Sequence, residues 1–214
     1  MQKAKIHMAQ KIAFIAASAM GLLLAGSLAF TSGLRFGDST DAFADCRKGA
    51  AAGSIGGPFT LQNKNGQTVT ETDVIANPSL IYFGYTFCPD VCPYDVARNA
   101  DAVDLLEERG ILATPIFISI DPARDTPKQV GEFAANIHER MIGLTGSPEQ
   151  VRAASKAYRT YYSKQEGDPD YYLVDHSTFT YLVLPETGFV QYFRRDVTPE
   201  DMAQTVACFV KAAQ

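Results

Sequence analysis

The chain has 214 residues, of which 46% are hydrophobic and 20% are charged, and its formal net charge is −5. This balance is typical of one globular domain with a core and an appendage, and excludes a largely disordered chain. Because the net charge is negative, the chain offers no basic field to hold a nucleic-acid backbone, and we expect no binding to DNA or RNA.

The N-terminal residues predict a single membrane anchor. Residues 1–11 carry three lysines and no acidic residue, and residues 12–30 contain no charged residue. About 20 apolar residues are enough to cross a bilayer as a helix, so residues 12–30 are expected to form a transmembrane helix or an uncleaved signal anchor. Lysines before the span predict that residues 1–11 are cytoplasmic. The rest of the chain then faces the periplasm, an oxidising compartment, from the inner membrane.

Two other interpretations of the apolar run remain, a cleaved signal peptide and a buried core helix. Signal peptides usually have a shorter apolar stretch of about 7–15 residues, and Ala42-Phe43-Ala44, which resembles a processing site, lies well beyond the run. The flanking lysines argue against a core helix. Residues 31–55, rich in small residues, predict a linker, and residues 56–214 predict the soluble domain. No Arg- and Ser-rich transit segment precedes the apolar run, which favours a bacterial source over a mitochondrial one.

The first elements of the domain are a hairpin, a strand and a helix. Residues 59–70 alternate apolar and polar side chains around Asn65-Gly66, which predicts a β-hairpin. Residues 79–86 form an apolar, aromatic run of strand length, which indicates a strand buried on both faces. Residues 93–109 show apolar side chains at helical spacing and predict a helix.

The middle of the domain continues this alternation. Residues 112–120 predict a second buried strand, and residues 126–138 predict a helix that opens with Thr126-Pro127, a good start signal. Residues 142–144 are a short candidate strand. Residues 148–162 predict a third helix, which follows a capping box.

The C-terminal part predicts a second hairpin and a last helix. Residues 178–184 and 189–194 flank a turn, and Thr198 precedes the terminal helix. The order of elements predicts an α/β domain whose mixed central sheet is covered by helices on both faces.

Two of the four cysteines lie close together, at Cys88 and Cys92. They fall between a predicted strand and the helix after it, so both sulfurs are expected near a helix N-terminus, which favours the thiolate. At this spacing the sulfurs can bridge each other or hold one ion. Two buried structural cysteines or a structural zinc site are the alternatives. Structural zinc takes four protein ligands, usually from two paired motifs, and no second pair is present.

The chain has three histidines, of which His176 is a candidate site residue. His7 belongs to the N-terminal basic stretch, and His138 is most simply a solvent-facing helix end. His176 comes just before the strand predicted over residues 178–184. By position alone, a single histidine there is more often structural than functional, so the residues leave its role open.

Three segments resemble the Sco/SenC family of copper-binding proteins. They are YFGYTFCPDVCP (82–93), DPARDTP (121–127) and VDHSTFTYLV (174–183). The resemblance extends from Gly56 through the terminal helix. It implies a thioredoxin-like fold that is tethered to a membrane on the side where cytochrome c oxidase exposes its dinuclear copper centre, CuA. The family is implicated in assembling that centre.

The resemblance implies that Cys88, Cys92 and His176 bind one copper ion per chain. It implies a supporting role for the acidic residues Asp90, Asp121 and Asp125. Phe87 stands where many relatives have histidine, which removes one potential extra ligand. The remaining cysteines, Cys46 and Cys208, do not belong to the family pattern, and either pair with each other or stay free.

Two thiolates and one imidazole suit copper. Soft thiolates select Cu(I), and imidazole also accepts Cu(II). Three ligands leave a position open for an acceptor, as transfer by ligand exchange requires. The ligand set therefore favours a copper chaperone, and the resemblance implies that it assists assembly of CuA. Its expected partners are the copper-bearing subunit of cytochrome c oxidase as acceptor, another copper chaperone as candidate donor, and the membrane.

The main alternative is a membrane-anchored thiol–disulfide oxidoreductase that reduces the cysteines of a copper-protein target. Two features argue against it. Cys88 and Cys92 have the spacing CxxxC rather than the CxxC of thioredoxins, and an oxidoreductase would give His176 no evident task. Peroxide reduction by Cys88 with Cys92 as resolving thiol, and a purely structural assembly factor, are further alternatives.

Overall fold

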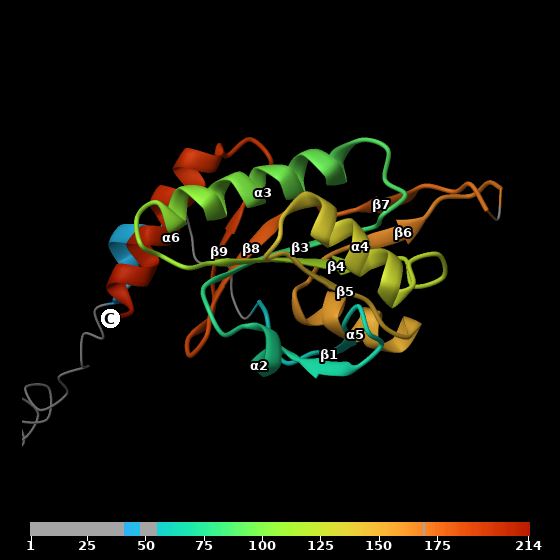
Figure 1. Ribbon diagram of the computed structural model, residues 1–214, viewed down its shortest axis with the longest axis horizontal. Coiled ribbons are helices and arrows are strands. Elements are labelled where there is room, and N and C mark those ends of the chain that lie inside the picture. Colours follow the sequence, from blue (N-terminus) through green and yellow to red (C-terminus); the bar gives the residue numbers. More distant parts are fainter. Residues whose placement is uncertain (1–40, 48–54, 169) are drawn as a thin grey trace, which may run out of the picture. The chain divides into compact units, whose positions relative to one another are not determined.

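The computed structural model describes residues 41–47, 55–168 and 170–214 (Figure 1). The predicted cytoplasmic segment (1–11) and membrane anchor (12–30) lie outside these residues, as does much of the predicted linker. Within the described ranges, no helix is both long and apolar enough to cross a membrane.

A five-stranded mixed sheet forms the centre of the domain. Its strands, in the order β5-β4-β3-β8-β9, are Ile142–Leu144, Thr114–Ser119, Ser79–Gly84, Thr180–Leu184 and Gly188–Phe193. Strands β3, β4 and β5 are parallel, whereas β8 and β9 run antiparallel to their neighbours. Every residue of β3 is buried, as its continuous apolar run predicts. The expected mixed sheet is confirmed, and each of its strands ends within two residues of its predicted bounds.

Helices cover both faces of the sheet. In chain order they are α3 Val91–Glu107, α4 Pro127–Ile137, α5 Pro148–Ala157 and α6 Pro199–Ala212. Alternating residues of β3 separate the two faces: Leu80 belongs to a cluster with residues of α3 and α6, whereas Phe83 stacks on Tyr158 just after α5. Figure 1 shows α3 and α6 side by side, with α5 across the sheet from them. The predicted thioredoxin-like arrangement is thereby confirmed.

The predicted first hairpin is present. Strands β1 (Thr60–Gln62) and β2 (Thr68–Thr70) pair antiparallel, and the short helix α2 (Glu71–Val74) follows directly. The side-chain oxygen of Asn63 accepts a hydrogen bond from the Asn65 amide at 2.9 Å, and Gly66 has a φ of 73°. The turn therefore uses glycine where the backbone is left-handed.

The helix predicted over residues 148–162 ends earlier, at Ala157. Arg159 takes a left-handed conformation, with a φ of 52°, and the Thr160 amide donates to Ser155 O at 3.0 Å, which closes the last turn. The chain then forms β6 (Tyr162–Lys164), which pairs antiparallel with β7 (Val174–His176). This two-stranded ribbon was not predicted. His176 is thus the last residue of its own strand, not a residue just before β8.

A disulfide joins the two ends of the described domain. Cys46, in the 3-10 helix η1 (Ala44–Cys46), bonds to Cys208 of α6, with a Cα–Cα distance of 5.6 Å. Phe43 packs on Phe209 beside it, with ring centroids 5.3 Å apart. Of the two outcomes that the sequence left open, the structure has the pairing. Residues 44–46 of the predicted linker are therefore attached to the domain.

Candidate metal centre

The two cysteines lie at the junction of β3 and α3. Cys88 is in the connecting loop, and Cys92 is the second residue of α3, which begins two residues earlier than predicted. The expectation that both sulfurs lie near a helix N-terminus is confirmed. A Cβ on Gly84, at the end of β3, would lie 2.8 Å from Cys92 Sγ. Only glycine at this position leaves room for the sulfur where it stands.

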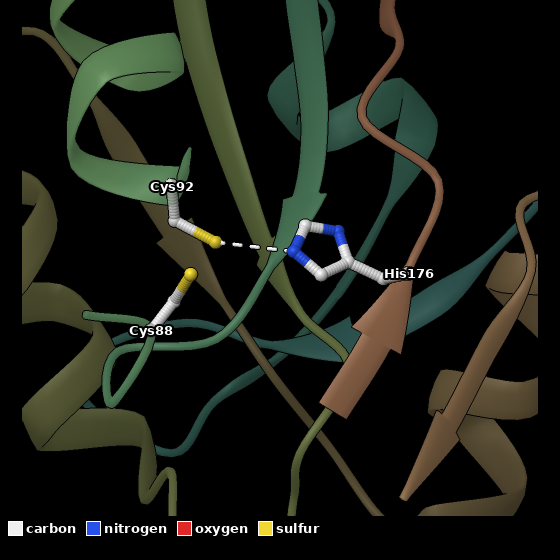
Figure 2. Close-up of side chains that lie close together, drawn as sticks. All are labelled: Cys88, Cys92 and His176. Carbon is white, nitrogen blue, oxygen red and sulfur yellow. Dashed lines mark hydrogen bonds between the residues drawn. The ribbon is translucent and has the colours of Figure 1, made fainter. Parts of the chain in front are cut away.

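His176 reaches the cysteines from β7. Its Nδ1 lies 2.9 Å from the carbonyl oxygen of Ser177, and since a carbonyl only accepts, Nδ1 carries the proton. Nε2 is then the nitrogen with a free lone pair, and it lies 3.4 Å from Cys92 Sγ. Figure 2 shows the three side chains pointing toward one another. Their ligand atoms all lie within 4.8 Å of one another.

The two thiols have opposite pKa shifts. The pKa of Cys88 is lowered well below its usual value, chiefly because the Cys92 thiol donates to its sulfur, with further help from the backbone N–H groups of Cys92 and Asp90. The pKa of Cys92 is raised, chiefly because its thiol donates to Cys88 and also because it is buried. At neutral pH the pair therefore holds one thiolate, on Cys88, and one thiol.

The site is open to solvent on one side. A shallow cleft of about 270 Å³ is lined by Cys88 and His176, together with residues of the cysteine loop and of β7. Cys88 is 8% exposed, whereas Cys92 is fully buried beneath it. A partner that enters the cleft thus meets Cys88 and His176 first.

The three acidic residues named with the site do not join the cysteine and histidine group. Asp125 accepts hydrogen bonds from the Thr86 amide at 3.0 Å and the Ser119 hydroxyl at 2.5 Å, so it joins the ends of β3 and β4. Asp121 accepts from the Tyr172 hydroxyl at 2.6 Å. Asp90 is exposed and its side chain does not cap α3. Asp121 and Asp125 therefore support the loops around the site.

The structure corrects the expectation for His138. Its side chain is only 10% exposed, and its Nε2 lies 3.0 Å from a carboxylate oxygen of Asp104 in α3. It joins the C-terminus of α4 to α3 instead of facing solvent, and it lies outside the cysteine and histidine group.

Several residues around the site were not predicted. The rings of Tyr82 and Tyr85 meet the His176 ring edge-on, with centroids 6.1 and 5.8 Å away. Arg124 lies among the aromatic side chains beside the cleft. It was visible in the sequence within DPARDTP, a segment that was interpreted through its acidic residues and its Thr-Pro helix start but not through its arginine.

The arrangement has two chemical capacities. Two sulfurs and an imidazole nitrogen are a set of three soft or borderline ligands for one metal ion. Without metal, a thiolate beside a thiol is also the starting point for disulfide exchange.

Comparison with known proteins places the chain in a family. The SCO1/SenC family model matches residues 47–211. Protein SenC of Rhodobacter capsulatus is 52% identical over 212 residues, which cover 98% of this chain and 95% of that protein. The mitochondrial SCO1 homolog 1 of Arabidopsis thaliana is 43% identical over 153 residues, which cover 70% of this chain and 46% of the plant protein. The match thus spans about half of the plant relative.

Solved structures agree with this result. The crystal structure of Arabidopsis thaliana ScoI with copper bound is 40% identical, with a TM-score of 0.70, and the match covers 73% of this chain and 99% of that one. The Bradyrhizobium japonicum ScoI structure, also with copper bound, is 35% identical, with a TM-score of 0.64 and coverage of 72% and 98%. BsSco, described as a member of the Sco family of cytochrome c oxidase assembly proteins, is 26% identical, with a TM-score of 0.56 and coverage of 71% and 91%. The chain belongs to the SCO1/SenC family.

Proposed function

We propose that this protein binds one copper ion through Cys88, Cys92 and His176 and delivers it to the copper-bearing subunit of cytochrome c oxidase, where CuA is assembled. The observation that carries the proposal is that two elements separate in the sequence bring two sulfurs and one imidazole nitrogen within 4.8 Å of one another. Copper bound in solved structures of similar proteins, and the description of BsSco, support the choice of metal and of target.

The ligand set favours copper over structural zinc. Zinc in structural sites takes four protein ligands in a closed tetrahedron, whereas this group offers three. Thiolates select Cu(I), and the imidazole makes Cu(II) acceptable. Because the group opens on a cleft, a ligand from another protein can reach the ion.

The residues prepare the site for loading and release. Cys88 is already a thiolate, so it can take up the ion without first losing a proton. Cys92 must release its proton as the ion binds, which makes loading release acid. Nδ1 of His176 is held by a carbonyl, so Nε2 stays directed at the ion. Transfer of the ion then begins on the cleft side of the site, where an acceptor's cysteine or histidine replaces Cys88 or His176 as a ligand. The buried Cys92 is the last ligand to dissociate.

The proposal includes the location of the protein. Residues 12–30 anchor it in the inner membrane, and residues 56–214 face the periplasm, where the donor is another copper chaperone. The charge-free run of residues 12–30 after a lysine-bearing segment supports this placement.

The substitution His176→Ala tests the three-ligand site. Loss of one ligand should weaken copper binding by roughly 100-fold, while reversible oxidation of Cys88 and Cys92 stays nearly intact. The measurement is an anaerobic copper titration of the reduced full-length protein in detergent, with bound-metal stoichiometry and sulfur-to-Cu(II) charge-transfer absorption. His138→Ala is the matched control, since that histidine lies outside the group. Unchanged copper retention in His176→Ala would show the site to be wrong.

A thiol–disulfide oxidoreductase is the second candidate. The lowered pKa of Cys88 supports it, because a thiolate is the form that attacks a disulfide. It predicts that the His176→Ala variant still reduces a disulfide substrate at close to the original rate. It also predicts that the wild-type protein does not retain copper after dialysis.

A further inference from the structure

Arg124 connects the two parts of the metal centre. It lies in the segment between β4 and α4, and its side chain is 12% exposed. Its guanidinium carbon is 3.6 Å from the ring centroid of Tyr172, two residues before β7, and 4.9 Å from that of Phe87, next to Cys88. One cation therefore contacts rings from both the cysteine loop and the segment that leads into β7, the strand that carries His176.

Hydrogen bonds fix this contact in place. Arg124 Nε donates to Asp121 Oδ2 at 2.6 Å, and Nη1 donates to the carbonyl oxygen of Tyr172 at 2.9 Å. The Tyr172 hydroxyl donates to the other oxygen of Asp121 at 2.6 Å. The three residues thus form a closed set of charge-assisted bonds, which are among the stronger hydrogen bonds in proteins.

Tyr172 is held from a second direction by Lys164 of β6. Its Nζ lies 3.5 Å from the ring centroid of Tyr172, and the Arg124 carbon lies 3.6 Å from the same centroid. Two cations this close to one centroid occupy opposite faces of the ring. Both are attracted by the negative ring faces, and the ring is clamped between them.

The remaining nitrogen of Arg124 has no hydrogen-bond partner. Nη2 is buried and unbonded among the described residues. The charge of Arg124 is thus compensated by Asp121 and by ring faces, including that of Tyr85 at 5.7 Å. Burying a guanidinium costs free energy, so this position is expected to do more than fill space.

The position of His176 depends on such side-chain contacts. Strands β6 and β7 form a separate two-stranded sheet that shares no ladder with the central sheet. Besides the Arg124 contacts, the amide of Val174 donates to the Tyr85 hydroxyl at 3.2 Å, and Nε2 of His176 meets Cys92 Sγ. The His176 ring also packs edge-on against the rings of Tyr82 and Tyr85. Among the described strands, no backbone ladder joins β7 to the central sheet, and the hydrogen bond and ring contact from Arg124 to Tyr172 join the segment before β7 to the rest of the domain.

We infer that Arg124 is a positioning residue that holds the strand carrying His176 against the cysteine loop. It acts on copper only through His176, by keeping the imidazole ordered before the ion arrives. The inference rests on the proposed function for its effect on copper, but the order of β7 can be measured without metal. Residues that orient metal ligands typically change affinity by about 10–100-fold when they are replaced.

The first experiment uses the reduced, copper-free full-length protein. Arg124→Met keeps much of the side-chain length and removes the charge. Hydrogen exchange of the Val174 amide is expected to rise by roughly fivefold or more, because the ribbon separates from the loop more often. Arg140→Met is the matched control, since Arg140 is also largely buried and paired, with Glu107 and Asp104 of α3. It should leave exchange at Val174 unchanged.

The second experiment is a double-mutant cycle with His176→Ala. Arg124→Met is expected to lower copper affinity by about tenfold with His176 present, and by less than about twofold in the His176→Ala background. Tyr172→Leu, which removes the ring that Arg124 contacts, should give the same pattern and replaces Arg124→Met if that variant does not fold.

The outcomes separate the two proposals. If the wild-type protein retains no copper, the proposed function is wrong, and the exchange experiment still decides whether Arg124 holds β7. If Val174 exchanges at the same rate in Arg124→Met and in the wild-type protein, the positioning role is wrong. An equal loss of copper affinity with and without His176 would also overturn it, because Arg124 would then act on the cysteines or on the whole fold.

Discussion

The chain contains two cysteine pairs with opposite properties, at opposite ends of α3. Cys46 and Cys208 are 162 residues apart and bridged, next to the C-terminal end of α3, where η1 meets α6 (Figure 1). Cys88 and Cys92 are four residues apart and unbridged, at the N-terminal end of α3. Both pairs are buried or nearly so, so burial alone does not separate a structural thiol from a reactive one.

The difference lies in the neighbours of the sulfurs. Cys46 belongs to a cluster of apolar side chains from α3, α6 and the sheet, and no other potential metal ligand joins it in the described structure. Cys88 and Cys92 have helix N–H groups, an imidazole and a cleft beside them. The Cys46–Cys208 disulfide is surrounded by apolar side chains and serves to stabilise the fold. Hydrogen-bond donors and access to solvent instead keep the Cys88 thiolate available for metal binding or disulfide exchange.

The largest expected effect comes from the unbridged pair. Cys92→Ser removes the buried ligand, and copper affinity should fall by at least roughly 1000-fold, more than for loss of a supporting residue. The free energy of unfolding should fall by about 1–3 kcal/mol, because a hydroxyl is more polar than the thiol it replaces in this buried position. Copper titration and chemical denaturation measure the two quantities. If the Cys92→Ser variant kept its copper, Cys92 would not be a metal ligand, and the division of the two pairs into a metal-binding pair and a structural pair would be wrong.

The bridged pair should respond in the opposite way. The double variant Cys46→Ser, Cys208→Ser leaves no unpaired thiol at that end and opens a loop that spans 162 residues. The free energy of unfolding is expected to fall by about 2–5 kcal/mol, because the unfolded chain regains conformational freedom. Copper affinity should stay within about twofold, since the sites are far apart in the fold. Denaturant titration under non-reducing conditions is the measurement, and a large loss of copper binding would contradict the separation of roles.

A smaller effect distinguishes the two free thiols from each other. The pKa of Cys88 is lowered, so its thiolate is present above the lowered value and disappears only when the pH falls through it. At about pH 6 an ordinary thiol is less than about 1% ionised. Iodoacetamide should therefore modify Cys88 at least roughly tenfold faster than Cys92 at that pH, as peptide mass spectrometry can follow. Equal rates, or a midpoint for Cys88 near that of a free thiol, would contradict the assignment.

Local patterns predicted most of the scaffold. The continuous apolar run of β3 and the Ser or Thr caps followed by proline before α4, α5 and α6 are short-range signals, and the structure has the elements where they stand. The cysteine pair was placed correctly for the same reason, since it lies between a strand and a helix that each have clear patterns.

These local patterns did not predict the contacts between residues far apart in the sequence. Strands β6 and β7 are three residues each, too short for periodicity, and the predicted helix extended to residue 162, the first residue of β6. The approach of His176 to Cys92, 84 residues earlier in the chain, came from family resemblance and not from spacing. Arg124 was overlooked because its aromatic partners lie in two segments far from it in the sequence, the cysteine loop and the residues before β7. The pairing of Cys46 with Cys208 could not be deduced from four cysteines.

The disulfide also determines how the domain bears mechanical force. Cys46 and Cys208 lie near the two ends of the domain, and nearly all of its strands and helices fall inside the loop that they close. When the domain is stretched between residues 42 and 214, the tension passes from Cys46 directly to α6. The sheet and the metal centre are bypassed, so the domain can lengthen only by the few residues outside the bridge until the bond is reduced.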